Sequence, residues 1–107
     1  MVNFDPSIGA EIKKTRPALI LQNDIANRFS PTVIVAAATS RFEEPFYPTE
    51  ILIKKYEGGL SQDSVILLNQ IKTIDKTRLI KHLGKIKSET MERVDKALEI
   101  SLGLIEI

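Results

Sequence analysis

The sequence predicts an α+β domain: a small, curled, mostly antiparallel sheet followed by one helix. Short apolar runs separated by turn residues recur from the N-terminus to about residue 86, which is typical of strands. Only the segment after residue 88 has helical spacing. The 107 residues show no repeat or linker and suit one domain, 1–107, with one core. Because so small a sheet buries little surface, a dimer is favoured.

The first half of the chain is expected to form three strands. They are a short strand at 2–4, a strand at 18–21 buried on both faces, and a second buried strand at 32–38. A loop over 5–15 and a polar turn region over 23–30 separate them. Pro17 excludes the helical state for Arg16 and removes one backbone donor, so the strand at 18–21 starts there or lies at a sheet edge.

The second half is expected to add three strands and a helix. The strands are a half-buried one at 49–54, a long one at 64–74, and a short one at 79–86 interrupted by Gly84. An exposed loop over 42–48 and turns at 58–59 and 75–78 connect them. Ser88 is a good N-cap and Gly103 is placed to end the helix, whose apolar face repeats from Met91 to Leu102.

Composition narrows the class of protein. The chain is 43% hydrophobic and 27% charged, as in ordinary soluble proteins. Its longest uncharged apolar run, 32–40, is too short to span a bilayer, and the N-terminus does not resemble a signal peptide. The absence of cysteine excludes disulfides, thiolate chemistry and a cysteine zinc site. We therefore expect a cytoplasmic protein without a membrane partner.

Charge is unevenly distributed in a chain whose net charge is only +1. Residues 72–87 hold six cations and one anion, whereas the sign reverses after residue 88. A second basic cluster comprises Lys13, Lys14 and Arg16. Any single lysine is more simply a solvated surface group, but two basic segments favour a local site for a polyanion.

Two segments, 15–24 and 32–41, each combine an apolar strand with an arginine and a threonine. In the first segment these two residues precede the strand, and in the second they lie at its end and just beyond it. If the strands pair antiparallel, Arg16 at the start of one faces Thr39 at the end of the other. A guanidinium beside a hydroxyl at a sheet edge suits a phosphate, because the fork donates two parallel hydrogen bonds to its oxygens.

Several segments resemble the MazF/PemK toxin endoribonucleases, in particular their Gram-positive type. The matching stretches are 5–11, 15–20, 22–24, 30–37 with Thr39 and Arg41, 63–76 and 94–102. The resemblance covers nearly the whole chain in order. It implies a homodimer of small SH3-like barrels that cleaves single-stranded RNA at short sequences without a metal or cofactor. It also implies a MazE-like antitoxin whose tail occupies the RNA groove.

The resemblance also assigns site residues. It places the family's catalytic arginine and threonine at Arg16 and Thr39, and its loop glutamate at Glu11. The polar pair beside the site falls on Asn69 and Gln70. We expect Lys72 and Arg41, which lie in the matching segments, to bind RNA with them. In this family the first strand usually begins several residues earlier, so either the start is assigned too late or the strand is truncated and leaves a sheet edge unpaired.

RNA cleavage by its own 2′-hydroxyl needs in-line positioning, stabilisation of negative charge, and proton transfer. Arg16 meets the second need as a permanent cation, and Thr39 can bind a phosphate oxygen or orient the 2′-hydroxyl. Arginine scarcely deprotonates in proteins, so it is a poor general base. Glu11 is the better candidate for base or orienter, with water as the alternative.

Each candidate site residue also has a simpler, non-catalytic interpretation. Without the resemblance, Arg16 is a surface cation and Thr39 a strand-end hydroxyl. His82, the only histidine, has no second histidine to share acid and base roles and is expected to be structural or solvent-facing. The amides of Asn69 and Gln70 suit base edges or a capped sheet edge equally.

The sequence leaves two rival functions open. One is a non-enzymatic, CcdB-like toxin that inhibits DNA gyrase by binding protein. The other is an RNA-binding barrel without turnover. The pairing of Arg16 with Thr39 favours RNA cleavage over both.

Overall fold

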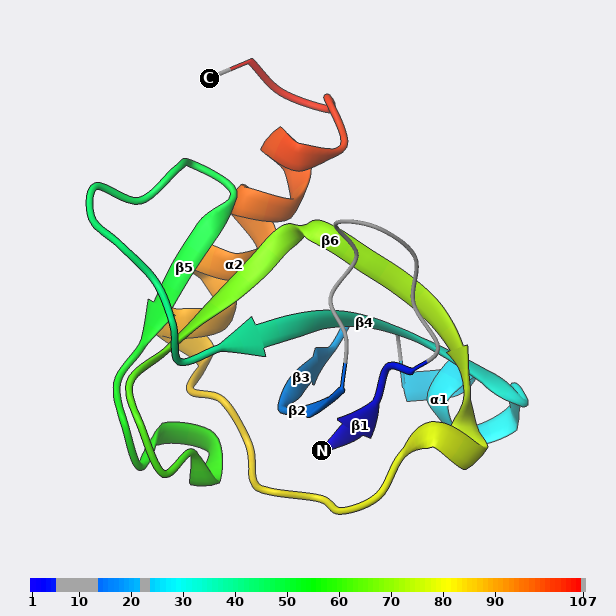
Figure 1. Ribbon diagram of the computed structural model, residues 1–107. Coiled ribbons are helices and arrows are strands. Elements are labelled where there is room, and N and C mark those ends of the chain that lie inside the picture. The colour runs from blue at the N-terminus through cyan, green and yellow to red at the C-terminus, as the bar shows by residue number, and fades with distance from the viewer. Residues whose placement is uncertain (6–13, 22–23, 107) are drawn as a thin grey trace.

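The computed structural model describes residues 1–5, 14–21 and 24–106, and its framework is one curled antiparallel sheet (Figure 1). Its strand order is β3-β4-β6-β5. These strands are β3 (Ala18–Ile20), β4 (Thr32–Thr39), β6 (Ser64–Asp75) and β5 (Glu50–Ile53). A second, two-stranded sheet joins β1 (Val2–Asn3) to β2 (Thr15–Arg16).

A large bulge in β6 curls the main sheet. Ala36 pairs with Ile71, but Ala38 pairs with Ile66, so residues 67–70 of β6 lie opposite the single β4 residue Ala37. Extra residues on one strand bend it and increase its twist. The first part of β6 therefore pairs with β5 as well as with the end of β4, and the sheet closes into a half-barrel (Figure 1).

The two faces of β4 bury two separate clusters, because successive side chains of a strand point to opposite sides. Val33, Val35 and Ala37 pack with Val2 and Phe4, which cover the inner face of the half-barrel. The alternate residues of β4 face helix α2 on the other side. That second cluster comprises Ala36, Ala38, Ile53, Leu60, Ile66, Leu68, Val94 and Ala97.

The predicted C-terminal helix is confirmed as α2 (Ser88–Ser101), which lies behind β5 and β6 in Figure 1. Its N-cap is Lys87, so Ser88 is the first helical residue and not the cap as predicted. Gly103 adopts φ 72°, a left-handed conformation that suits glycine after a helix end. Just beyond this turn, Leu104 is 70% exposed.

Three predictions in this part of the fold are wrong. Residues 23–30 are not simply a turn, because α1 (Asp24–Phe29) forms there. This helix shows no apolar period that predicts it, and its two large apolar side chains do not form a buried stripe: Ile25 and Phe29 are 75% and 74% exposed. Strand β3 is not buried on both faces, since Ile20 is 40% exposed.

The third concerns residues 79–86, which form no strand. In the described chain their backbone pairs at the start, through the isolated bridge Val2–Leu79, the bond from Ile80 N–H to the Met1 carbonyl (2.8 Å) and the bond from the Met1 amino group to the Lys81 carbonyl (2.8 Å). Beyond that point the segment runs extended along the bottom of Figure 1 toward α2. A strand needs a partner along its length, and β1 supplies one for two residues only.

The connections otherwise follow the predicted positions. Glycine-rich η1 (Glu57–Gly59) and η2 (Lys76–Arg78) are short 3₁₀ turns. The carboxylate of Asp75 caps η2 by accepting from Thr77 N–H (2.8 Å), which lowers the pKa of Asp75. In the described part of the chain, no helix has the length and apolar character needed to cross a membrane.

Candidate active site

The antiparallel register of β3 with β4, continued toward β2, sets Arg16 across from Thr39. Ala18 pairs with Ala37, and Ala38 N–H donates to the Pro17 carbonyl (2.9 Å). One further step in this register brings Arg16 opposite Thr39. Residues directly opposite each other point to the same face, so the guanidinium and the hydroxyl start from one side of the sheet. Pro17 connects β2 to β3, and its carbonyl keeps the hydrogen bond to β4.

The Thr39 hydroxyl is held in a tight local turn. It accepts from Arg41 N–H (3.1 Å) and donates to the Arg41 carbonyl (3.2 Å). This turn ends β4 and fixes the orientation of the Thr39 side chain. The second hydroxyl lone pair remains a possible acceptor, and the donated hydrogen can rotate to a ligand oxygen. Arg41 itself is exposed just beyond this turn.

Thr39 and Lys72 occupy the inner face of the half-barrel. Thr39 continues the alternation of Val33, Val35 and Ala37, which all point inward. Lys72 pairs with Val35 and therefore points to the same side. The inner face is thus apolar near its centre and polar at its rim.

The bulge in β6 turns Asn69 and Gln70 to this face together. Leu68 and Ile71 both pack in the α2 cluster, so the strand changes phase between them. Alternation from either neighbour directs Asn69 and Gln70 away from α2, toward the inner face. They lie opposite Ala37, two residues from Thr39 along β4, which is about 7 Å.

Ser101, at the end of α2, fixes this bulge. Its Oγ donates to the Leu68 carbonyl (2.7 Å), while Leu68 N–H donates to the Thr49 carbonyl (2.9 Å). The backbone N–H and C=O of Leu68, the residue before Asn69, therefore both have hydrogen-bond partners. The sequence signal for this contact is a serine, Ser101, within the otherwise apolar stripe from Met91 to Leu102.

Replacement Ser101→Ala should loosen the bulge without unfolding the protein. It leaves the Leu68 carbonyl without its donor, which costs about 1–3 kcal/mol. We expect faster hydrogen exchange at the backbone amides of Asn69 and Gln70, measured by NMR. Ser88→Ala, at the exposed other end of α2, is the matched control and should leave those amides unchanged. Equal exchange in both variants would show that the hydroxyl does not hold the bulge.

The residues on either side of the loop that carries Glu11 are hydrogen-bonded to each other. Phe4 N–H donates to the Lys14 carbonyl, and Lys14 N–H donates to an Asp5 carboxylate oxygen, each at 2.9 Å. Arg78 Nη1 also donates to the carbonyls of Asn3 (3.2 Å) and Asp5 (2.7 Å). Glu11 itself lies outside the described residues. Sequence reasoning did not identify this role of Arg78.

The loop over 42–48 carries three aromatic side chains near the end of β4. Phe42 and Phe46 contact each other with ring centroids 5.7 Å apart, so they anchor their own loop, whereas Tyr47 is exposed. Among residues 1–5, 14–21 and 24–106, no three His, Asp or Glu side chains are grouped as a metal site would require.

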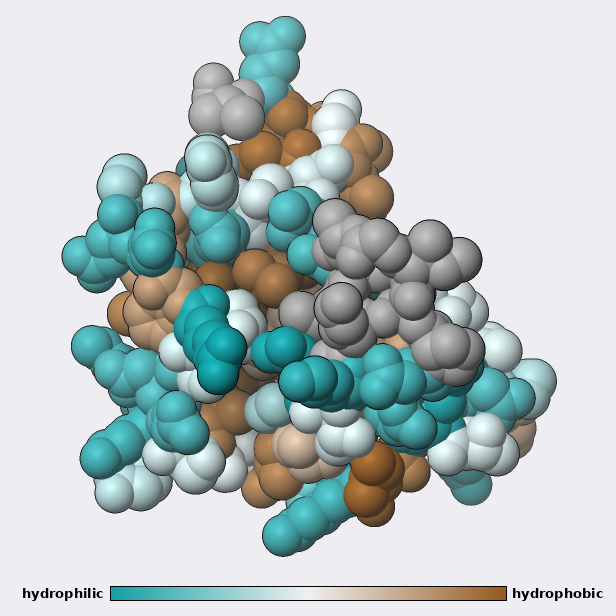
Figure 2. Space-filling view, in the orientation of Figure 1, coloured by the Kyte–Doolittle hydropathy of each residue, from teal (hydrophilic) through white to brown (hydrophobic). Residues whose placement is uncertain are grey.

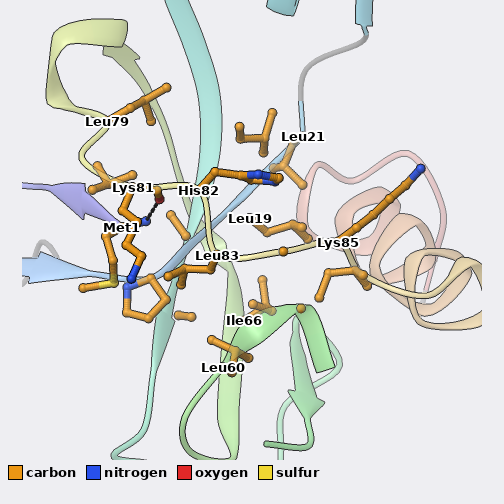
Figure 3. A pocket seen from close by; sticks show the side chains of 18 of the residues that line it. Met1, Leu19, Leu21, Leu60, Ile66, Leu79, Lys81, His82, Leu83 and Lys85 are labelled. Atoms are coloured by element: carbon orange, nitrogen blue, oxygen red, sulfur yellow. Dashed lines mark hydrogen bonds between the residues drawn. The ribbon is translucent and has the colours of Figure 1, made fainter. Parts of the chain in front are cut away.

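His82 is exposed and lies apart from these groups. It lines a cavity of about 670 Å³ beside β3, together with Leu19, Leu21 and Leu83 (Figure 3). Neither Arg16 nor Thr39 lines that cavity. Pro17 and Ala38, next to them in the sequence, do line it, so the cavity borders the candidate active site without including these two side chains.

His82→Ala should leave the activity of this site nearly unchanged, because the imidazole is not among the groups that surround Arg16 and Thr39. The check is the RNA cleavage rate of the variant, measured beside the wild type across pH 5.5–8.5. A loss of tenfold or more would place the acid–base group at His82.

The fold agrees with the comparison to known protein families. Residues 1–102 match the family described as PemK-like, MazF-like toxin of type II toxin-antitoxin system. The chain belongs to this family, which confirms the resemblance seen in the sequence.

Individual relatives support the same assignment. Endoribonuclease EndoA of Bacillus subtilis is 48% identical over 104 residues, 97% of this chain and 90% of the relative. MazF from Deinococcus radiodurans has a TM-score of 0.81 at 26% identity, covering 95% of this chain and 89% of that one. An endoribonuclease in complex with its cognate antitoxin, from Mycobacterial species, gives 0.73 at 25%, covering 86% and 84%.

Proposed function

We propose that this toxin is a sequence-specific endoribonuclease that cleaves single-stranded RNA without a metal and so arrests translation. The observation that carries the proposal is the register that sets Arg16 opposite Thr39 on the face shared by the other polar candidates. The 48% identity to an endoribonuclease over most of the chain supports it. The family match favours this function over the CcdB-like gyrase inhibitor.

In the reaction, the 2′-oxygen attacks the adjacent phosphorus and the bond from phosphorus to the 5′-oxygen breaks. The products are a 2′,3′-cyclic phosphate, or its hydrolysed form, and a 5′-hydroxyl. Extra negative charge develops on the non-bridging oxygens as the 2′-oxygen attacks. Arg16 stabilises it, because a guanidinium stays charged and can donate two hydrogen bonds to one phosphate.

Thr39 and Glu11 complete the chemistry. The Thr39 hydroxyl, already fixed by its turn with Arg41, transfers its donated hydrogen bond from the Arg41 carbonyl to a phosphate oxygen. Glu11 is the proposed base or orienter that accepts the 2′-hydroxyl proton, directly or through water. The departing 5′-oxygen takes a proton from the same carboxyl group or from water.

The other polar residues near Thr39 bind and recognise the RNA. The amides of Asn69 and Gln70 can donate to and accept from base edges of unpaired nucleotides. Lys72 and Arg41 supply positive charge for flanking phosphates. Because Asn69 and Gln70 lie about 7 Å along β4 from Thr39, one strand of RNA can contact the amides and the scissile site together.

The proposed partners are a second copy of the chain and a MazE-like antitoxin, with the cytoplasm as the location. Figure 2 shows hydrophobic surface at the top of the view, over the C-terminal end of α2. There Leu102 and Leu104 are 52% and 70% exposed, which supports burial against another chain.

The test is incubation of the purified protein with a long unstructured RNA in excess EDTA, followed by mapping of both new ends. Cleavage at a short recurring sequence, with cyclic phosphate and 5′-hydroxyl ends, is the expected result. Intact RNA that is nevertheless bound would identify an RNA-binding barrel. Intact, unbound RNA together with inhibited gyrase would identify the non-enzymatic toxin.

A further inference from the structure

Lys14 has an unusual backbone conformation two residues before Arg16. Its φ is 67°, in the left-handed region that residues with a side chain rarely adopt. The Lys14 side chain is exposed, so its burial does not account for this conformation. A strained residue persists only where the surrounding structure holds it. The groups that hold Lys14 therefore bear on the neighbouring Arg16.

Both backbone polar groups of Lys14 are bonded to residues just after β1. Its N–H donates to Asp5 Oδ1 (2.9 Å), and its carbonyl accepts from Phe4 N–H (2.9 Å). Asp5 N–H in turn donates to Asn3 Oδ1 (3.0 Å). Phe4 is 1% exposed in the inner cluster, so this side of the pairing is anchored in the core. The Asp5 carboxylate thus supplies a charge-assisted hydrogen bond that holds the left-handed residue.

Arg78 holds the same segment through its backbone. Its Nη1 donates to the carbonyls of Asn3 (3.2 Å) and Asp5 (2.7 Å), the two residues that flank Phe4. The arginine ends η2, which begins directly after β6 and is capped by the Asp75 carboxylate. Arg78 is half-buried, which limits the freedom of its side chain. The segment that bonds Lys14 is thereby tied to the long strand of the main sheet.

This cluster lies at one end of the ladder that orients Arg16. In that ladder Val2 pairs with Arg16, and both strands lie below β4 in Figure 1. Val2 is 2% exposed in the inner cluster, so the Arg16 side chain opposite it starts from the same face. A slip of one residue would turn Arg16 to the other face. The bonds from Lys14 to Phe4 and Asp5 oppose such a slip, because they belong to this register alone.

We propose that Asp5 and Arg78 are positioning residues of the nuclease. They hold Lys14 in its left-handed conformation and so keep Arg16 on the face where it meets the scissile phosphate. The inference rests on the proposed endoribonuclease function and adds residues that act on the reaction through Arg16. A misplacement of about 1 Å can cost on the order of 10²-fold in rate. Loss of these bonds should therefore lower the rate of the chemical step more than the affinity for RNA.

The first test is the single-turnover cleavage rate at a saturating concentration of an RNA with one mapped site. Asp5→Ala removes the acceptor for Lys14 N–H and should lower this rate at least about tenfold, with RNA affinity changed less than about threefold. Asp5→Asn keeps an acceptor oxygen and is the matched control, which should stay within about threefold of wild type. An acid–base role of the carboxylate predicts an asparagine variant as slow as alanine, and that result would overturn the proposal.

The second test removes the strain itself. Glycine adopts a positive φ without steric cost, so Lys14→Gly should raise the rate of the Asp5→Ala variant at least about fivefold. Lys14→Ala in the same background also loses the charge but keeps Cβ, and it should restore nothing. An alanine that rescues as well as glycine would show that Asp5 does not act on the conformation of Lys14.

A double-mutant comparison shows whether the effect passes through Arg16. Asp5→Ala combined with Arg16→Ala should cleave within about threefold of Arg16→Ala alone, because no guanidinium remains to be positioned. Losses that multiply in full would mean that Asp5 acts by another route.

Arg78→Ala should lower the rate as Asp5→Ala does, again with RNA affinity and its salt dependence nearly unchanged. A direct contact of Arg78 with an RNA phosphate would instead weaken binding and reduce that salt dependence. Such a change in binding would remove Arg78 from the positioning role.

Should Asp5→Ala fail to fold by circular dichroism, Lys14→Val and Lys14→Asn ask the same question with Asp5 and Arg78 intact. Valine is strongly disfavoured at positive φ and asparagine tolerates it, so valine alone should slow cleavage, by at least about tenfold. Equal rates would overturn the proposal. A wild-type protein that does not cleave RNA would overturn the proposed function, and this inference with it. An active wild type matched in rate by a folded Asp5→Ala variant would overturn this inference alone.

Discussion

Arg16→Ala is expected to reduce RNA cleavage by about 10³-fold or more, the usual effect of removing a cation that stabilises charge developing on a phosphate. The side chain sits at the end of β2, half-buried, and is not part of either core cluster. The fold should therefore survive. The measurement is the single-turnover cleavage rate of an RNA that contains one mapped site.

Two controls make this result specific. Arg16→Lys keeps the charge and loses the planar fork, so it should retain a partial rate between wild type and alanine. Circular dichroism and the melting temperature of Arg16→Ala should match the wild type within a few degrees. Retained turnover in a folded Arg16→Ala protein would remove this residue from the mechanism.

Gly59→Ala is expected to be the most destabilising of the substitutions considered. Gly59 has φ +77°, where a side chain costs about 1–2 kcal/mol. A Cβ there would also collide with the carbonyl oxygen of Leu83, so the backbone of η1 or of residues 79–86 must shift. Overpacking of this kind adds about 1–3 kcal/mol, and the melting temperature should fall by roughly 10 °C or more.

Gly103→Ala separates the two causes. Gly103 has a similar φ of +72°, yet a Cβ there meets nothing within 4 Å. It should cost only the conformational part, about 1–2 kcal/mol. Thermal or urea unfolding of both variants gives the comparison. Equal losses would mean that the approach of Leu83 to Gly59 does not constrain the fold.

The long elements of this fold were predictable because each buries a periodic stripe. Strand β6 and helix α2 were found within one or two residues for that reason. Helix α1 was missed because it is short and its two large apolar side chains, Ile25 and Phe29, are exposed. The segment 79–86 was predicted as a strand from its composition, but strand formation depends on a partner, which local sequence does not reveal.

The candidate site also has parts that the sequence predicts and parts that it does not. That Arg16 lies opposite Thr39 followed from two strands and one register, and the structure has this register. The common direction of Asn69 and Gln70 could not be foreseen, because it depends on a bulge that opposes four residues of β6 to Ala37. The clasp of Arg78 on Asn3 and Asp5 joins residues more than seventy positions apart, so no local pattern announces it.

The most direct test of the account is a crystal structure of the protein with an RNA whose scissile 2′-hydroxyl is replaced by hydrogen. The account predicts that the Arg16 guanidinium and Thr39 Oγ1 both lie within about 2.7–3.2 Å of oxygens of the phosphate at that position. A bound RNA whose scissile phosphate is contacted by neither side chain, or by groups on the opposite face of the sheet, would contradict it.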